Sequence, residues 1–565
     1  MNQGQKYDAI VVGAGMSGSW SAKELCERGM KTLLLERGRD VKHIKDYPTT
    51  NLNPWEFSHR GGISIKEQES NPSIARCYAY REDNKHFFVK DTDHPYIQDQ
   101  PFDWIRGYQV GGKSIMWARH TQRWSNFDFE GPARDGFAVD WPIRYSDLAP
   151  WYKKVEIFAG ISGNKDGLDV LPDGEFLKPL PLNCIEEHFQ KSLRKHYDDR
   201  HLIYARCAHL TESREIYVQQ GRGLCLNRTE CERGCPFGGY FNANSTTIPW
   251  AAKTGNLTLR PYSVVHSIIL NKDGNKAIGV RVIDSMTKET TEFYADVIFL
   301  NAGALNTLLL LLNSTSDRYP EGLGNDSGTL GKYVAFHNYR ARISGICEDH
   351  LDKKTIGKRP SGAYIPRFRN VYRQETDFLR GYASGFNASR IKIRSREGLG
   401  QELRDRLFAP TTLGPWYVSA YMMGETIPKE SNAVRLDKDE KDEWGIPLLR
   451  ISVNYDENDE KMITDFQEQF TEMFELARYS DIKVNDDHRA PGLDIHEMGG
   501  ARMGHDPATS VLNRWHQIHS CKNVFVTDGA CMTSTSTQNP SLTYMAMAAR
   551  AANFAVDEIQ KGNLI

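Results

Sequence analysis

The sequence lacks any long hydrophobic run. A membrane-spanning helix needs about 18 or more consecutive apolar residues, and the longest comparable stretch, residues 302–313, is shorter and contains Asn306 and Thr307. We therefore expect no transmembrane segment in this chain. The N-terminus also lacks the basic segment, apolar core and small-residue cleavage site of a secretory signal. If the protein leaves the cytoplasm, we expect another component to carry it.

The sequence also lacks a charge imbalance and a cysteine framework. Lys and Arg number 71 and Asp and Glu number 73, for a net charge of -2. This balance argues against a nucleic-acid partner, which would require a basic surface. Ten cysteines in 565 residues are too few for a disulfide-stapled fold. The length predicts an ordinary globular chain of about two to four domains.

The first clear motif lies near the N-terminus. An apolar run at residues 7–12 is followed by Gly13, Gly15 and Gly18, and a helix-like segment follows these glycines. In such a turn the first glycine permits a tight bend, the second lets a pyrophosphate approach the backbone, and the third allows the helix to pack on the strand. The next apolar strand ends in Glu36, which is placed to bind a ribose. The spacing predicts a dinucleotide-binding unit, although it does not distinguish FAD from NAD.

Five further segments follow in a characteristic order. They are residues 107–124 (GYQVGGKSIMWARHTQRW), 296–307 (DVIFLNAGALNT), 496–504 (HEMGGARMG), 524–530 (VFVTDGA) and 538–552 (QNPSLTYMAMAARAA). Together with the first glycines, this series resembles the glucose-methanol-choline (GMC) oxidoreductases. Within that family the chain is most similar to the bacterial FAD sugar dehydrogenases and the catalytic subunits of glucoside 3-dehydrogenases.

The resemblance implies an α/β (α+β overall) fold with two interleaved domains, similar to p-hydroxybenzoate hydroxylase. A Rossmann-like FAD-binding domain is expected from residues 1–45, 100–130, 250–335 and 490–565. A substrate domain with an antiparallel sheet over the flavin is expected from residues 46–99, 131–249 and 336–489, including the cysteine-rich loop 225–235. The apolar and charged runs on either side of a Trp-Gly turn in residues 437–455 predict strands of that sheet.

The resemblance also implies which residues contact FAD. Besides Gly13, Gly15, Gly18 and Glu36, these are Gly111, Gly112, Ser114, Ala302, Gly303, Asp528, Gly529, Asn539 and Pro540. Residues 107–124 could instead form an ordinary glycine loop, and Asp528 could simply cap a turn. Some relatives bind FAD covalently through a His where this chain has Met116, so we expect non-covalent FAD.

A histidine and an asparagine are the candidate catalytic pair. Alcohol oxidation by hydride transfer requires a base for the hydroxyl proton, and histidine suits this role because its pKa lies near neutrality. His496 and Asn539 match the catalytic histidine of the family and the residue that orients the alcohol beside the flavin. Asn539 precedes a proline and could be only a turn residue. His337 and His505 also lie in family-like segments, and we expect structural roles for them.

Three cysteines, Cys225, Cys231 and Cys235, lie within eleven residues on a loop rich in Gly and Pro. Thiolates at such spacing can share one metal centre. Similar insertions occur in related dehydrogenases that carry a three-iron four-sulfur cluster, which three local ligands suit. The alternatives are a loop disulfide with one free thiol, or a zinc site completed by a distant residue such as His209.

These observations favour an FAD-dependent dehydrogenase that oxidises a secondary hydroxyl of a sugar or glycoside, most plausibly at C3 of a glucopyranoside. The expected partners are a small accessory subunit and a cytochrome c or quinone-linked electron acceptor. Export to the periplasm with that subunit is one expectation, and a cytoplasmic location is the alternative. Two further functions stay open: an oxidase of the same fold that forms peroxide from O2, and a non-catalytic flavin subunit that relays electrons.

Overall fold

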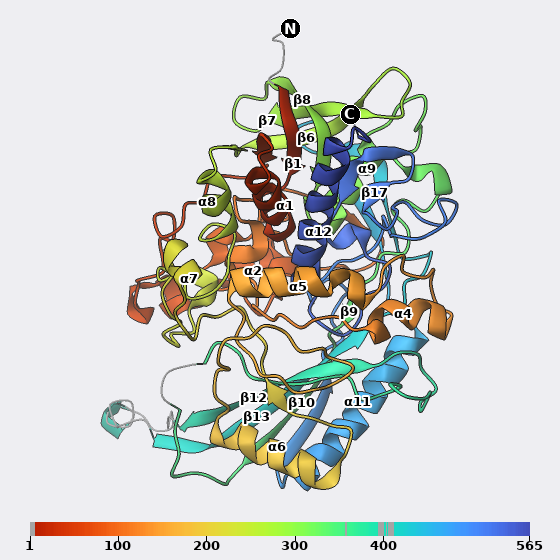
Figure 1. The fold of residues 1–565 in the computed structure, drawn as a ribbon. Coiled ribbons are helices and arrows are strands. Elements are labelled where there is room, and N and C mark those ends of the chain that lie inside the picture. Colours follow the sequence, from red (N-terminus) through yellow and green to blue (C-terminus); the bar gives the residue numbers. More distant parts are fainter. Residues whose placement is uncertain (1–5, 356–358, 394–399, 403, 405–411, 565) are drawn as a thin grey trace.

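The computed structural model describes residues 6–355, 359–393, 400–402, 404 and 412–564. The strands in these residues form sheets of eight, seven and three strands. Figure 1 shows two layers, with the first and last helices around the upper sheet and the seven-stranded sheet below. Both chain ends lie at the top of this view, so the two termini belong to the same layer.

The helices vary widely in length. They are α1 (Met16–Glu27), α2 (Ile65–Ser70), α3 (Pro72–Ala75), α4 (Asn126–Asp135), α5 (Tyr145–Ala159), α6 (Cys184–His196), α7 (Glu215–Gln219), α8 (Thr247–Ala252), α9 (Ala304–Asn313), α11 (Glu457–Leu476) and α12 (Ser541–Gln560).

The eight-stranded sheet forms the centre of the upper layer. Its strands are β1 (Lys6–Val12), β2 (Thr32–Leu35), β5 (Leu257–Arg260), β6 (Ser263–Leu270), β7 (Ala277–Asp284), β8 (Thr290–Leu300), β17 (Gln517–Ile518) and β18 (Cys521–Val526). The strands β18, β8, β1, β2 and β5 are parallel. One face packs on α1 and α12 and the other on α9, which explains why β1 is an unbroken apolar run.

The seven-stranded sheet is antiparallel and forms the centre of the lower layer. Its strands are β4 (Ile203–Tyr204), β9 (His337–Asn338), β10 (Ala341–Cys347), β11 (Ala363–Ile365), β12 (Tyr382–Ile393), β13 (Thr412–Glu425) and β16 (Ser480–Asp486). Side chains alternate between its faces. Ile343, Ala420 and Phe386 are cross-strand neighbours on one face and belong to the same core as residues of α6 and α11. Both helices lie along this sheet (Figure 1). Residues of the opposite face, such as Arg342 and Tyr421, point toward the upper layer and line a cavity.

The third sheet corrects one prediction. Strands β14 (Ala433–Lys441) and β15 (Pro447–Ser452) pair with β3 (Ile97–Gln98), not with the seven-stranded sheet. Leu436 and Leu449 pack in the same core as α9 of the upper layer. The hairpin predicted from residues 437–455 therefore forms, but it lies outside the sheet to which we assigned it. A hairpin pattern shows that two strands pair and does not show which core they cover.

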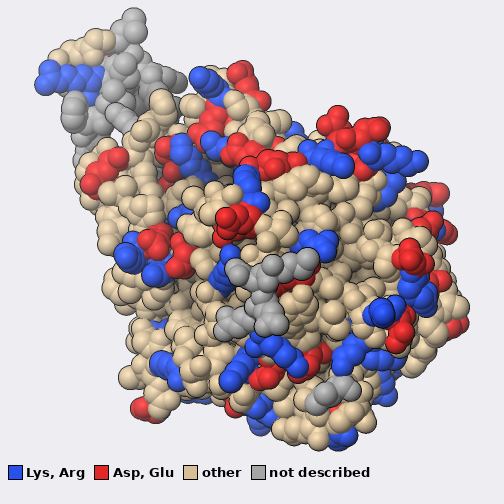
Figure 2. Space-filling view, turned by 90° about the horizontal axis from the view of Figure 1, so that it is seen from above, with Lys and Arg blue, Asp and Glu red and all other residues tan. Residues whose placement is uncertain are grey.

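The predicted segments can be compared with these sheets. All strands of the eight-stranded sheet fall within residues 1–45, 250–335 and 490–565, and all strands of the seven-stranded sheet fall within 131–249 and 336–489. The surface seen from above the upper layer carries interspersed acidic and basic side chains, with no large area of one sign on this face (Figure 2). None of the helices in the described residues is long and apolar enough to cross a membrane.

Candidate active site

A cavity of about 620 Å³ lies between the two layers. The carboxyl ends of β1, β2, β8 and β18 contribute one wall, and the seven-stranded sheet contributes another. Ligands of open parallel sheets bind at these strand ends. Among the predicted site residues, these line the cavity: Gly13, Gly15, Glu36, Gly112, Ser114, Ala302, Gly303, His496, Asp528, Gly529, Asn539 and Pro540.

The glycine turn after β1 is shaped for a close ligand. Gly13 has φ +97°, and a Cβ there would lie 2.3 Å from the carbonyl oxygen of Asn301. A Cβ at Gly18 would lie 1.9 Å from the carbonyl oxygen of Gly13, so Gly18 permits the helix to pack on the turn and does not line the cavity. At Gly15 a Cβ would meet no atom within 4 Å. That open space beside the first turn of α1 fits a pyrophosphate.

Glu36 follows β2 and is buried at the same end of the cavity. Its carboxylate accepts hydrogen bonds from the backbone N–H groups of Ala14 and Gly38, each at 3.0 Å. Burial raises the pKa of Glu36 to about 7. The carboxylate thus connects β2 to the glycine turn and stands where a ribose would lie.

The glycine segment of residues 107–124 packs closely against the glycine turn that follows β1. Gly112 has φ +50°, and a Cβ there would lie 3.2 Å from the Cα of Gly15. Gly111 has φ +93° and does not line the cavity, because it packs on Asn244. Ser114 donates to the carbonyl oxygen of Gly111 and accepts from the N–H of Ala243. This segment therefore forms one side of the cavity, and its contact with FAD stays a prediction.

The carboxylate after β18 links three parts of the cavity wall. Asp528 accepts hydrogen bonds from the N–H of Gly303 at 2.9 Å, from Thr307 Oγ1 at 2.6 Å and from the N–H of Ala530 at 3.0 Å. It therefore caps a turn and also lines the cavity, and its contact with FAD stays a prediction. Burial raises the pKa of Asp528 to about 6. Pro540 immediately precedes α12, whose first turn opens on the same cavity.

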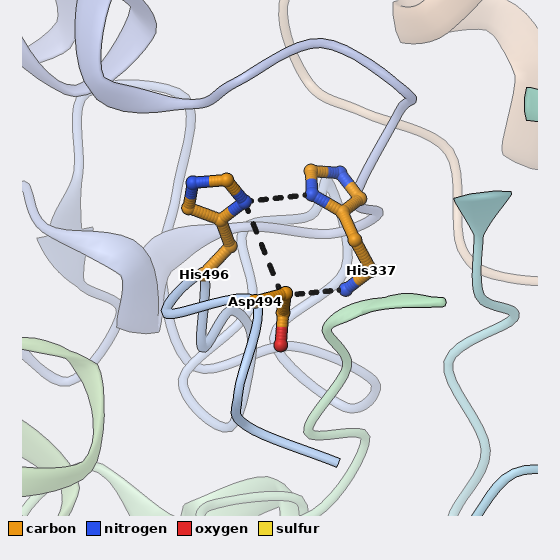
Figure 3. Close-up of side chains that lie close together, drawn as sticks. All are labelled: His337, Asp494 and His496. Atoms are coloured by element: carbon orange, nitrogen blue, oxygen red, sulfur yellow. Dashed lines mark hydrogen bonds and ion pairs between the residues drawn. The ribbon is translucent and has the colours of Figure 1, made fainter. Parts of the chain in front are cut away.

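Two histidines face each other beside the cavity, which His496 lines (Figure 3). His496 Nδ1 lies 2.9 Å from His337 Nδ1, and His496 Nε2 lies 3.3 Å from Asn539 Nδ2. His337 Nε2 lies 3.2 Å from the carbonyl oxygen of Thr535 and 3.1 Å from that of Ser536. The predicted pair of His496 and Asn539 is brought together, and His337 is a third member that we expected only to be structural.

The hydrogen-bond partners of the His337 and His496 rings show which ring nitrogens carry protons. The two carbonyl oxygens can only accept hydrogen bonds, so His337 Nε2 carries a proton. Burial lowers the pKa of His337 to about 4, which leaves the ring neutral and Nδ1 without a proton. His496 Nδ1 must then donate to His337. Burial, with His337 and Lys113 nearby, also lowers the pKa of His496 well below its ordinary value, so its Nε2 is unprotonated. The Nε2 lone pair accepts a hydrogen bond from Asn539 Nδ2 at 3.3 Å, which leaves His496 neutral and available as a proton acceptor.

A buried carboxyl group lies behind the two rings. Asp494 Oδ2 accepts a hydrogen bond from the backbone N–H of His337 at 2.9 Å and lies 3.9 Å from His496 Nδ1 (Figure 3). Burial raises the pKa of Asp494 to about 7. Asp494 thus fixes the backbone that carries His337. The sequence analysis did not predict a role for Asp494. Its position two residues before His496 was the feature that could have indicated one.

The wall opposite the nucleotide turn comes from the seven-stranded sheet. Tyr421 on β13 and Arg342 on β10 are cross-strand neighbours. Tyr339 lies beside them, with 5.2 Å between its ring centroid and that of Tyr421. Asn387 and Arg489 also line this wall. None of these was predicted, because no local motif marks them.

The cysteine loop forms a separate, smaller cavity of about 30 Å³. Cys225, Cys231, Cys235 and His209 all line it. Cys231 Sγ lies 3.8 Å from His209 Nε2, and His209 Nδ1 is buried without a hydrogen-bond partner in the described structure. All ten cysteines are described, and all are free thiols. The loop disulfide is therefore not formed in this structure.

The spacing of the four candidate ligands is wider than a zinc site requires. Zn–S bonds of about 2.3 Å in tetrahedral geometry place the sulfurs about 3.8 Å apart. No three of these four residues bring their ligand atoms within 4.8 Å of one another, and the group that meets this criterion among the described residues is His337, Asp494 and His496.

Comparisons with known proteins agree with this geometry. Residues 7–338 and 428–548 match the two models of the GMC oxidoreductases. The chain is 28% identical to the 2-methyl-1,2-propanediol dehydrogenase of Mycolicibacterium austroafricanum, over 97% of this chain and 94% of the relative. It is 25% identical to the fructose dehydrogenase large subunit of Gluconobacter japonicus, over 99% and 100% of the two chains.

A solved structure shows the same fold. Pyridoxine 4-oxidase from Mesorbium loti superposes with a TM-score of 0.59 and 18% identity, over 97% of this chain and 98% of that one. The open space at Gly15 and the carboxylate of Glu36 suit the dinucleotide of FAD. His496, in the same cavity, suits an alcohol substrate. The chain therefore belongs to the GMC oxidoreductase family and is an FAD-type enzyme that acts on CH–OH groups.

Proposed function

We propose that this protein is a dehydrogenase that oxidises a secondary hydroxyl of a sugar or glycoside, at C3 of a glucopyranoside, to give a 3-keto sugar. The carrying observation is that His496 Nε2 lies 3.3 Å from Asn539 Nδ2 in the cavity that the nucleotide turn also lines. The similarity to a fructose dehydrogenase large subunit supports a sugar as substrate.

The chemistry divides between the chain and its cofactor. FAD, when bound, supplies the acceptor for the hydride from the carbinol carbon. His496 Nε2 accepts the hydroxyl proton as the O–H bond breaks, and the oxygen and carbon form the carbonyl group. Asn539 orients the substrate oxygen toward Nε2. His337 keeps the proton of His496 on Nδ1, so that the lone pair stays on the side of the substrate.

A substrate screen tests this proposal. The FAD-loaded protein is mixed anaerobically with methyl glucosides, disaccharides and simple secondary alcohols, and bleaching of the flavin absorbance is followed. We expect a glucoside to bleach the flavin and the product to carry a ketone at C3, detected by NMR. Bleaching by simple alcohols but by no sugar would contradict the proposed substrate. Peroxide formation without an added acceptor would instead identify an oxidase.

We further propose that the loop of Cys225, Cys231 and Cys235 holds a three-iron four-sulfur cluster. Bound there, the cluster supplies one-electron chemistry for an external cytochrome c or quinone-linked acceptor. The three thiols share one cavity, and their spacing exceeds that of a zinc site. The FAD is held without a covalent bond in this proposal, because Met116 stands at the relevant position.

The surface beside the loop supports a protein partner. Leu224, Leu226 and Phe237 are 43%, 59% and 42% exposed, and Trp55 is 77% exposed. The segment that carries Trp55 lies on the loop, because Arg233 donates to the carbonyl oxygens of Thr49 and Leu52, each at 3.0 Å. Clustered apolar side chains on a surface often mark a protein interface. We propose that an accessory subunit or electron acceptor binds here, and that export to the periplasm occurs with that subunit.

Replacement of one cysteine tests the electron exit. We expect Cys231→Ser to lose iron and turnover with the one-electron acceptor, while substrate still bleaches the flavin, because Cys231 lies outside the substrate cavity. Cys184→Ser is a matched control, since Cys184 is a partly exposed thiol at the start of α6. Iron and sulfide analysis of anaerobically purified protein gives the second measurement. Wild-type protein without iron or sulfide would refute the cluster.

A further inference from the structure

The wall of the cavity opposite the nucleotide turn carries two arginines that share one carboxylate. Arg342 lies on β10, and Arg489 follows β16, the neighbouring strand. Arg342 Nε lies 3.5 Å and Arg489 Nε 2.8 Å from the same atom, Asp487 Oδ2. Both arginines line the cavity that contains His496.

Each guanidinium group is fixed, yet each keeps free donors. The Arg342 guanidinium carbon lies 3.9 Å from the ring centroid of Tyr339 and 5.5 Å from that of Tyr421, so the group is stacked between strands. Arg342 Nη1 donates to the carbonyl oxygen of Ala341 at 3.2 Å. In the part of the chain that the structure describes, Arg342 Nη2 and both terminal nitrogens of Arg489 make no hydrogen bond. Their side chains are 21% and 29% exposed.

Asp487 neutralises one of the two guanidinium groups. Asp494 also lines the cavity, but burial raises its pKa to about 7, so its carboxyl is partly protonated at neutral pH. Two guanidinium groups and the Asp487 carboxylate sum to one net positive charge. The other cations that line this end have their own partners: Lys113 pairs with Glu497 at 3.3 Å, and Arg119 pairs with Glu232 at 2.9 Å. A singly charged anion would neutralise the remainder, and a guanidinium fork matches the two oxygens of a carboxylate.

The position of the two arginines connects them to the reacting end of the cavity. Tyr339, on which Arg342 stacks, follows β9 directly, and β9 begins with His337, the partner of His496. Arg489 lies seven residues before His496 on the segment that leaves β16. A group held by the arginines would therefore belong to the same substrate that places its hydroxyl at His496.

We propose that Arg342 and Arg489 form a carboxylate-binding subsite, and that the substrate is a sugar or glycoside carrying a carboxylate, such as a hexuronide. This inference rests on the proposed function and specifies its substrate class. A phosphate would place nearly two negative charges against one positive charge, so the charge balance favours the carboxylate.

Matched ligands test the proposal on the FAD-loaded full chain. The probes are methyl β-D-glucopyranoside, the corresponding methyl glucuronoside and glucose 6-phosphate. Calorimetry on the His496→Ala protein gives the dissociation constants without turnover, and flavin bleaching of the wild type gives the rates. We expect the glucuronoside to bind about 10-fold to 100-fold more tightly than the glucoside, as charge-assisted bidentate bonds allow. Exposed charges are screened by salt, so this ratio falls at high ionic strength.

Variants assign the preference to the two arginines. We expect the ratio of the two dissociation constants to fall to within about threefold in Arg489→Gln and in Arg342→Gln, the loss of the charge-assisted bonds just estimated. Arg514→Gln, which changes an exposed arginine paired with Asp147, should leave the ratio as it is in the parent. Equal or weaker binding of the glucuronoside, or a preference unchanged in both arginine variants, would overturn the proposal. Tighter binding of the phosphate would assign the subsite to phosphates instead.

The two proposals fail in different ways. If the glucoside bleaches the flavin and the glucuronoside neither binds nor reacts, sugar oxidation stands and the carboxylate subsite falls. If the glucuronoside binds through the arginines while no sugar bleaches the flavin, the subsite stands and the proposed oxidation falls.

Discussion

The two ends of the main cavity are built in different ways. The nucleotide end is made largely of backbone, from glycines and a buried carboxylate in consecutive residues around β1 and β2. The substrate end is made of side chains from β9, β10, β13 and the segment after β16, which meet only through the sheet. In our proposal, the first end binds a group common to many enzymes, and the second end selects the alcohol. The comparison predicts that substitutions at one end should leave the function of the other intact.

The largest effect that tests this separation is expected at His496. We expect His496→Ala to lower the rate of flavin reduction by about 100-fold to 10,000-fold, the usual contribution of a general base. FAD should remain bound, because His496 lies at the substrate end. Stopped-flow absorbance measures the rate, and the flavin-to-protein absorbance ratio measures occupancy. His505→Ala is the control, since His505 is 64% exposed. A rate within threefold of the wild type would remove His496 from the mechanism.

The converse test changes the nucleotide end. We expect Gly13→Ala to weaken FAD binding by about 10-fold to 100-fold, because the new Cβ would strain a backbone at φ +97° and press on the Asn301 carbonyl. Gly29→Ala imposes a similar strain at φ +84° but meets no atom within 4 Å, and serves as the control. Titration of the apoprotein with FAD gives both affinities. Equal losses in the two variants would show that backbone strain alone, and not the cavity wall, explains the effect.

A smaller effect is expected at His337, which acts through its partner. His337→Leu removes the acceptor of the Nδ1 proton of His496, and an unpaired buried donor costs about 1–3 kcal/mol. We expect flavin reduction to slow by about 5-fold to 50-fold and His337→Asn, which offers an oxygen acceptor, to recover most of the rate.

The pH profile distinguishes a positioning role from loss of structure. The pKa of His496 is lowered well below its ordinary value, so its base form persists and the acid limb of the reduction rate should lie well below the pKa of a free imidazole. In His337→Leu we expect this acid limb to move to higher pH, because His337 is one of the causes that lower the pKa of His496. An unchanged limb with a uniformly lower rate would indicate a structural defect.

The same contrast explains how far the sequence alone was informative. Gly13, Gly15 and Glu36 act through a local strand, turn and helix, so their spacing predicts their place in the fold. His496 and Asn539 were found because they stand in recognisable segments. His337 pairs with a residue 159 positions away. Arg342 and Arg489 approach each other only through the register of β10 and β16. Strand register depends on packing across the whole sheet, which the sequence does not display.

The hairpin of β14 and β15 shows the same limit. Its strands and turn were predicted, but its partner strand β3 was not. The residues of the hairpin are compatible with either sheet. Contacts of Leu436 and Leu449 with the upper core decide its position.

The pairing of the two imidazoles also determines the route of the proton. Once His496 Nε2 holds the substrate proton, its Nδ1 proton points toward His337 Nδ1, to which it is hydrogen-bonded. Beyond His337 stand the carbonyl oxygens of Thr535 and Ser536, which are not bases. The Asp494 carboxyl, whose Oδ2 lies 3.9 Å from His496 Nδ1, is the basic group beside the ring pair, and it lines the same cavity as His496. The proton therefore leaves these groups into the cavity that also holds the product, so product departure and regeneration of the base are linked.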